Sequence, residues 1–181
     1  MSRNIVITSG KGGVGKSNLA VNLAVWFTKL GKKVIIFDAD FGLANVEVMF
    51  GTVPKHDLSD MIYNGMSLKE IITPGPMDIG FISGGSGIIA LNNLTSAQIN
   101  MVLNDLNSLS DLCDILIVDT GAGISDNVLK FVLASPDVLL VTTPEPSSLT
   151  DSYSLVKAMV RNESFDRDKV RIRMIANKVQ S

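Results

Sequence analysis

The sequence contains one cysteine and no surplus of charge of either sign. Cys113 cannot form a disulfide within the chain, so the cysteine content gives no sign of an oxidising compartment. Among the 181 residues, 16 are basic and 18 are acidic, and the formal net charge is -2. Proteins that bind nucleic acid through electrostatics carry a strongly basic face. We therefore expect no specific nucleic-acid ligand.

Long apolar runs are also lacking. Continuous apolar stretches, such as residues 34–37 and 115–118, are far shorter than the roughly 18 residues that cross a bilayer as a helix. The first residues lack the apolar core of a secretory signal peptide. We therefore expect a cytoplasmic protein. At about 150 residues per domain, the length predicts a single domain that comprises residues 1–181.

What the sequence does contain is an alternation of short β-branched runs with helical patterns. Strands are predicted at residues 5–8, 34–37, 79–83, 115–118, 138–141 and 170–175. Helices are predicted up to Leu30, where Gly31 ends the first, and at 96–109, 126–133 and 149–160. This order predicts an α/β fold of three layers, in which helices flank a mainly parallel sheet. Ligands of such sheets bind at the carboxyl ends of the strands.

Two local features refine this prediction. Thr95 can cap the helix that follows it, with Gln98 at the spacing of a capping box. Residues 51–80 are the least regular stretch, because three prolines interrupt short helical segments there. We expect this stretch to be a surface excursion from the sheet.

The segment after the first predicted strand reads G-K-G-G-V-G-K-S and fits the phosphate-loop pattern G-x-x-x-x-G-K-[ST]. Its glycines, at positions 10, 12, 13 and 15, are expected to let the backbone turn tightly, so that N–H groups face phosphate oxygens. The helix that starts near Lys16 adds the positive end of its dipole. Lys16 can neutralise the outer phosphates, and Ser17 can ligate Mg²⁺. Phosphate contacts are expected from Gly10, Lys11, Gly12, Gly13, Val14, Gly15, Lys16 and Ser17.

The same segment also fits the dinucleotide pattern G-x-G-x-x-G, and Asp38 ends the second predicted strand, where a dinucleotide-binding fold keeps its ribose-binding acid. Two observations argue against a nicotinamide or flavin. The lysine and hydroxyl at positions 16 and 17 suit a triphosphate with Mg²⁺. Asp119 ends a further apolar strand, at the Mg²⁺-organising position of phosphate-loop enzymes. The alternative for Asp38, Asp40 and Asp119 is helix capping or solvation at strand ends.

Lys11 discriminates among phosphate-loop proteins. The pattern K-G-G-x-G-K-[ST], at Lys11 to Ser17, resembles the deviant Walker A loop of the MinD/ParA-type ATPases. In that family the first lysine reaches across an ATP-sandwich homodimer to the phosphates of the partner. The resemblance therefore implies a homodimer in the ATP state and a cation supplied in trans, which can raise a rate by about 10³–10⁵.

Other segments agree with this resemblance. Residues 37–45 resemble the second acidic motif and first switch of the family, which implies that Asp40 positions the attacking water and that Asp38 lies beside the metal. Residues 119–123, D-T-G-A-G, resemble the second switch, where Asp119 would hold Mg²⁺ through water. The implied catalytic residues are Lys11, Lys16 and Asp40, and the implied metal site comprises Ser17, Asp38, Asp40 and Asp119.

Within the family, D-T-G-A-G and residues 143–153 are most similar to the FlhG branch, MinD-like ATPases that control the number and position of flagella. The resemblance implies an ATP-hydrolysing switch that uses Mg²⁺ and has the SRP-type GTPase FlhF or flagellar switch proteins as partners. Family members associate peripherally with the inner membrane through a C-terminal helix beyond the region that ends here at Ser181. We therefore expect the chain to be C-terminally truncated.

The choice of base follows from the residues after the last predicted strand. Guanine-binding relatives carry an aspartate at the fourth position of this motif, whereas Gln180 offers one acceptor oxygen. Asn177, with Lys178 beside it, can pair with N6 and N7 of adenine, which predicts ATP rather than GTP. The nitrogenase iron proteins share the Lys11-type loop but need two cysteines per subunit, and the single Cys113 excludes them.

Three alternatives remain open. A septum-site-determining MinD would differ in its partners rather than in its chemistry. A ParA-type partitioning ATPase would bind DNA, which the slightly acidic charge balance disfavours. A nucleotide-gated scaffold would hold ATP but barely hydrolyse it.

Overall fold

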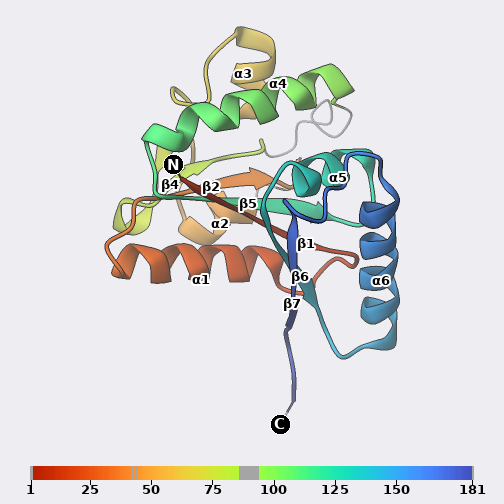
Figure 1. The fold of residues 1–181 in the computed structure, drawn as a ribbon. Helices are drawn as coiled ribbons and strands as arrows, with labels where there is room; N and C mark the ends of the chain where they lie inside the picture. Colours follow the sequence, from red (N-terminus) through yellow and green to blue (C-terminus); the bar gives the residue numbers. More distant parts are fainter. Residues whose placement is uncertain (1, 42, 44, 86–93, 181) are drawn as a thin grey trace.

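The computed structural model of the chain describes residues 2–41, 43, 45–85 and 94–180. Seven strands form one sheet in the order β3-β4-β2-β5-β1-β6-β7, in which only the pair of β3 and β4 is antiparallel (Figure 1). The strands are β1 (Arg3–Ser9), β2 (Val34–Ala39), β3 (Thr73–Pro74), β4 (Gly80–Ile82), β5 (Ile115–Ala122), β6 (Asp137–Thr142) and β7 (Arg171–Ala176). This mainly parallel sheet confirms the predicted α/β fold.

Helices cover both faces of the sheet and complete three layers (Figure 1). One face carries α1 (Lys16–Lys29) and α2 (Asn45–Phe50), and the other carries α3 (Leu58–Asn64), α4 (Ser96–Leu106), α5 (Asp126–Leu133) and α6 (Pro146–Arg161). Ile7 and Ile36 belong to the core under α1, whereas Val6 and Phe37 belong to the core under the other helices. Because the central strands are buried on both faces, their sequences are continuously apolar.

The predicted elements are confirmed, with shifts at their ends. Every predicted strand is present within a few residues of its expected position. Thr95 and Gln98 form the expected capping box at the start of α4. The predicted helix at 96–109 ends as an α-helix at Leu106 and continues as a 3₁₀ helix, η3 (Asn107–Asp111). The helix predicted from residue 149 begins already at Pro146, because proline suits the first helical turn.

The prediction that residues 51–80 are a surface excursion is wrong. Leu58, Met61, Leu68 and Ile71 are at most 4% exposed and belong to the core beneath α4. Their segments are short, so no long hydrophobic period marks them in the sequence. The short strand β3 and the 3₁₀ turn η1 (Pro76–Asp78) also lie in this stretch.

The order of the strands determines where the polar ends meet. β5 lies between β2 and β1, so their carboxyl ends are neighbours at one edge of the sheet. Asp38 and Asp119 are direct Cα partners in the pairing of β2 with β5, and Ile7 of β1 pairs with Asp119. The loop that follows β1 therefore emerges beside both carboxylates. In the described ranges, none of the helices combines the length and apolar character needed to cross a bilayer.

Candidate phosphate-binding site

The loop between β1 and α1 leaves the amino end of α1 open. Gly13 and Gly15 have φ angles of 72° and 101°, in the left-handed region that favours glycine. Gly15 is the N-cap of α1 and carries no side chain that could accept from the N–H groups of the first turn. These N–H groups are available to phosphate oxygens, at the positive end of the helix dipole.

Gly10 and Gly12 differ in what surrounds them. A Cβ atom on Gly10 would lie 2.2 Å from the backbone carbonyl carbon of Asp151 in α6, so Gly10 permits the close approach of a helix. A Cβ atom on Gly12 would meet nothing within 4 Å, and its φ is not positive. Gly12 lies in the turn as predicted, but only Gly13 and Gly15 among the four glycines have a positive φ, and Gly10 is required by its contact with α6.

A cleft of about 530 Å³ lies over this loop. Its lining combines Lys16 and Ser17 with Asp40 from the end of β2, and the apolar side chains of Val48 and Met49 from α2 form one wall. Lys16 is only 7% exposed and thus places a positive charge at the base of the cleft. The structure therefore brings together the phosphate loop and Asp40, as the sequence predicts. Residues 42 and 44 of the predicted first switch lie outside the described residues.

Two buried carboxylates lie next to the cleft, Asp38 and Asp119, both 0% exposed. Burial raises the pKa of Asp38 to about 7, although hydrogen bonds from the N–H groups of Val46 and Asp40 oppose the rise. Burial likewise raises the pKa of Asp119 to about 6. These hydrogen bonds place Asp38 as a cap on the start of α2, which is the role that the capping alternative assigned to it.

Asp119 has a different environment from Asp38. Neither of its carboxylate oxygens has a hydrogen-bond partner among the described residues. The neighbouring Ser17 hydroxyl and Lys16 ammonium groups lower the pKa of Asp119, but no hydrogen bond of normal geometry reaches it. An unpaired buried carboxylate is costly, and a cation in the cleft would relieve that cost.

The donor set suits Mg²⁺ rather than a metal held by the protein alone. Among the described residues, no cluster of three or more His, Cys, Asp or Glu side chains is arranged to hold a metal ion. Mg²⁺ typically takes one or two protein ligands and completes its shell with water and substrate phosphates. The Ser17 hydroxyl group and the Asp119 carboxylate are therefore sufficient protein donors for a Mg²⁺ ion that arrives with a nucleotide.

Asp40 is held in a fixed position at the rim of this site. The Asn45 side chain donates to its Oδ2 atom over 3.2 Å. A Cβ atom on Gly121 would lie 3.1 Å from Oδ1 of Asp40, so glycine at 121 leaves room for the carboxylate. The predicted first and second switch segments therefore touch at Asp40 and Gly121.

Lys11 lies on the other side of the loop and contacts the start of α6. Its ammonium group donates to Glu145 over 2.5 Å and to the Ser147 hydroxyl over 2.9 Å. The backbone of Lys11 has a separate contact: the hydroxyl group of Ser9 donates a hydrogen bond to the Lys11 carbonyl over 2.7 Å. Residues 143–153 resemble a family segment in sequence, but this resemblance does not identify Glu145 and Ser147 as partners of Lys11. No local pattern signals a contact between residues so distant in the chain.

Asn177 and Lys178, expected at the base, support the phosphate loop directly. The Asn177 amide donates to the carbonyl of Val14 over 2.8 Å, and the Lys178 ammonium group donates to the carbonyl of Gly13 over 2.7 Å. A cavity of about 210 Å³ next to Asn177 offers space beside the loop. The Asn177 carboxamide keeps its oxygen and a second N–H group for a ligand there.

The chain is similar to known proteins over most of its length. A family model described as "ParA: NUBPL iron-transfer P-loop NTPase" matches residues 1–165. The Antiactivator FleN of Pseudomonas aeruginosa is 41% identical over 177 residues, which cover 98% of this chain and 62% of that protein. The Flagellum site-determining protein YlxH of Helicobacter pylori is 42% identical over 160 residues, which cover 88% of this chain and 54% of that protein. The chain thus spans between half and two thirds of the length of these relatives.

Solved structures share the fold of most of this chain. The septum site-determining protein MinD of Pyrococcus horikoshii, complexed with Mg-ADP, matches with a TM-score of 0.79 at 26% identity, over 95% of this chain and 68% of that one. A MinC:MinD cell division protein complex of Aquifex aeolicus matches with a TM-score of 0.80 at 26% identity, over 99% of this chain and 70% of that one.

Proposed function

Because the chain belongs to the ParA/MinD family of P-loop NTPases, we propose that it binds ATP with Mg²⁺ in the cleft over the phosphate loop and hydrolyses it. The observation that carries this proposal is the unpaired, buried Asp119 carboxylate beside Lys16 and Ser17. A buried carboxylate without a hydrogen-bond partner, next to a lysine and a hydroxyl group, matches a Mg²⁺ ion that arrives with a triphosphate.

The residues of the cleft have separate roles in the proposed phosphoryl transfer. Lys16 and the open N–H groups of α1 bind and orient the phosphates. Ser17 and Asp119 would hold Mg²⁺, which when bound neutralises charge that develops on the phosphate oxygens. Asp40, held by Asn45, would orient the attacking water. Catalysis of this kind consists chiefly of positioning and electrostatic stabilisation.

We further propose that the ATP-bound form is a homodimer. Lys11 would leave Glu145 and Ser147 and place its ammonium group beside the phosphates bound by a second copy. A cation added at that point acts on charge that develops in the transition state. Asn177 would pair with the edge of adenine while it keeps its contact with Val14. Within this proposal, residues 1–181 act as a single ATPase domain.

The biological role that we propose is control of the number or position of flagella. The names of FleN and YlxH support it, at 41% and 42% identity. A septal role is the second candidate, since a MinD of Buchnera aphidicola is 35% identical over 155 residues. The flagellar proposal includes FlhF or flagellar switch proteins as expected partners. It also includes peripheral attachment to the inner membrane.

The proposal is tested by titrating the purified chain with ATP in the presence and absence of Mg²⁺ and by measuring phosphate release. We expect Mg²⁺-dependent binding of ATP that NAD and FAD do not match, together with slow hydrolysis. Binding without phosphate release, under all conditions including a candidate partner, would favour the nucleotide-gated scaffold. Preferential binding of NAD or FAD would reject the phosphate-loop interpretation.

A further inference from the structure

Three phenylalanine rings meet next to the carboxyl end of β2. The ring centroid of Phe41 lies 6.3 Å from that of Phe37 and 5.9 Å from that of Phe131. The centroids of Phe37 and Phe131 are 5.7 Å apart. All three pairs are tilted or edge-to-face, which is a favourable arrangement of aromatic rings. We call these three rings the phenylalanine cluster.

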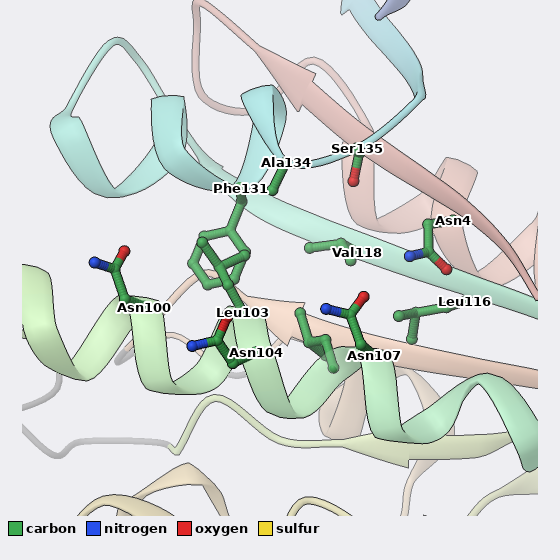
Figure 2. Close-up of a pocket in the computed structure, with 11 residues that line it drawn as sticks. Asn4, Asn100, Leu103, Asn104, Asn107, Leu116, Val118, Phe131, Ala134 and Ser135 are labelled. Atoms are coloured by element: carbon green, nitrogen blue, oxygen red, sulfur yellow. The ribbon is translucent and has the colours of Figure 1, made fainter. Parts of the chain in front are cut away.

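The phenylalanine cluster joins two segments that border the cleft over the phosphate loop. Phe37 belongs to β2, and Phe41 directly follows Asp40, which lines the cleft. Phe131 belongs to α5, the helix that follows the predicted second switch at 119–123, and its ring borders a cavity of about 390 Å³ between α4 and α5 (Figure 2). Phe37 and Phe131 are at most 2% exposed. They therefore give Phe41 a firm support within the core.

The backbone of Asp40 has few other restraints on the side of the chain that follows it. Its N–H group donates to Oδ1 of Asp38 over 3.1 Å, and its carbonyl accepts from the N–H group of Leu43 over 3.2 Å. The second hydrogen bond closes a turn that contains Phe41. The Leu43 side chain is 67% exposed, so it does not attach this turn to the core. The partly buried ring of Phe41 does so instead, because it packs against the core beneath α5.

We propose that Phe41 is a positioning residue for ATP hydrolysis: its ring, held in the phenylalanine cluster, keeps the Asp40 carboxylate in place at the rim of the cleft. This inference rests on the proposed function, because it needs Asp40 to orient the attacking water. The hydrogen bond from Asn45 fixes the direction of the carboxylate but not the backbone that carries it. A displacement of about 1 Å in such a site can cost about 100-fold in rate.

The phenylalanine cluster lies on the opposite face of the sheet from the elements that would bind the phosphates. Its rings belong to the core beneath α3 to α6. Val14 of the phosphate loop and Ala20 and Ala24 of α1 belong to the core on the other face. Lys16 and the N–H groups of α1 therefore keep their support when the ring of Phe41 is removed. Loss of this ring should lower kcat and leave the affinity for ATP nearly unchanged.

The experiment measures kcat from phosphate release and, separately, the dissociation constant for ATP with Mg²⁺ by titration. Phe41→Ala should lower kcat by about tenfold or more while the dissociation constant changes little. Phe41→Leu keeps most of the apolar side chain, so it should fold like the original chain and restore most of kcat. Leu109→Ala is the control for lost stability. It truncates a fully buried side chain of the same core near the amino end of β5, and below its unfolding temperature it should leave kcat unchanged.

A double-mutant cycle tests whether Phe41 acts through Asp40. Asp40→Asn should remove most hydrolysis, and radiolabelled ATP makes the residual rate measurable. Phe41→Ala should lower this residual rate no further, because the carboxylate that the ring positions is already absent. A further loss equal to that in the original chain would show that Phe41 acts independently of Asp40 and would overturn the inference.

The remaining outcomes separate this inference from the proposed function. The inference alone is overturned if Asp40→Asn loses hydrolysis while Phe41→Ala keeps full kcat, if Phe41→Ala loses affinity in parallel with rate, or if Leu109→Ala lowers kcat equally. If the original chain releases no phosphate, or if Asp40→Asn keeps the full rate, the proposed role of Asp40 fails and the inference fails with it.

Discussion

The Lys11 ammonium group lies 2.5 Å from the Glu145 carboxylate at the start of α6 in the same chain. Lys11 also occupies the position of the lysine that, in the family which its loop resembles, reaches the phosphates of the partner. The two side chains are 36% and 61% exposed, so water screens their attraction and the pair contributes little to stability. Lys11 thus has a weak contact within its own chain, and in the proposed homodimer the phosphates bound by a second copy would replace it.

The first prediction concerns Lys11 itself. Lys11→Ala should abolish most ATP hydrolysis, because a cation supplied in trans accounts for about 10³–10⁵ in rate. The affinity of a single chain for nucleotide should change little, since Lys16 and the N–H groups of α1 remain. Phosphate release and the binding of a fluorescent ATP analogue measure the two effects separately. A parallel loss of affinity and rate would place Lys11 in its own nucleotide site instead.

The second prediction concerns pH and the buried carboxylates. Asp38 and Asp119 bind protons more tightly in the folded chain, with pKa values of about 7 and about 6, than at the ordinary value of 3.8. The stability that these protons contribute is present below the ordinary pKa and is lost as the pH rises through about 6 and then about 7. Asp119→Asn should remove its share of this loss, on the order of 3 kcal/mol. Urea denaturation of the nucleotide-free chain at acidic and mildly alkaline pH measures it.

The affinity for ATP in the presence of Mg²⁺ should depend on pH in the opposite direction from the stability of the nucleotide-free chain. Metal ligation needs the ionised carboxylate, so the affinity for ATP in the presence of Mg²⁺ should rise with pH over the range in which Asp119 loses its proton. Removal of Mg²⁺ with a chelator should abolish the rise. If affinity and its Mg²⁺ dependence prove constant across this range, then Asp119 is not part of the metal site.

The third prediction contrasts two glycines of the same loop. Gly10→Ala forces a Cβ atom into the backbone of α6 at Asp151 and should destabilise the chain by about 1–3 kcal/mol or more. Gly12→Ala meets open space and should leave the stability of the nucleotide-free chain nearly unchanged. Thermal or urea unfolding distinguishes the two variants. Equal destabilisation by both would mean that the loop, rather than its contact with α6, requires glycine.

The fourth prediction concerns Asn177. Asn177→Ala removes the hydrogen bond to the Val14 carbonyl and should lower the free energy of unfolding by about 1 kcal/mol. It should also lower the affinity for ATP more than the affinity for inorganic triphosphate, because the adenine contact is lost as well. Gln180→Ala, at an exposed position, is the control. An equal effect on both ligands would assign Asn177 to the loop alone.

The sheet and the phosphate loop could be predicted from sequence because their signals are local. Apolar runs buried on both faces identify the central strands, and the spacing from Gly10 to Ser17 identifies the loop. The convergence of Asp38 and Asp119 followed from the rule that parallel strands share a carboxyl edge, and their pairing in register fits that rule.

Other features depend on contacts between segments that are distant in the chain. Glu145 meets Lys11 only because α6 packs against the end of β1, 134 positions away. The same packing gives Gly10 its purpose, which the motif alone assigned to a turn. Leu58 and Leu68 are buried through tertiary contacts of short segments, and no periodicity announces them. Side-chain contacts of this kind follow from the assembled layers.

The hydrogen bonds from Asn177 and Lys178 to the phosphate loop have a consequence for biosynthesis. The residues that they join are 163 and 165 positions apart, almost the whole chain. During translation the glycine-rich loop emerges from the ribosome early, but it lacks these restraints until β7 has been made and has joined the sheet. A nascent chain therefore acquires its full capacity for nucleotide only when synthesis has passed Lys178, and a fragment that stops before this point should hold ATP poorly.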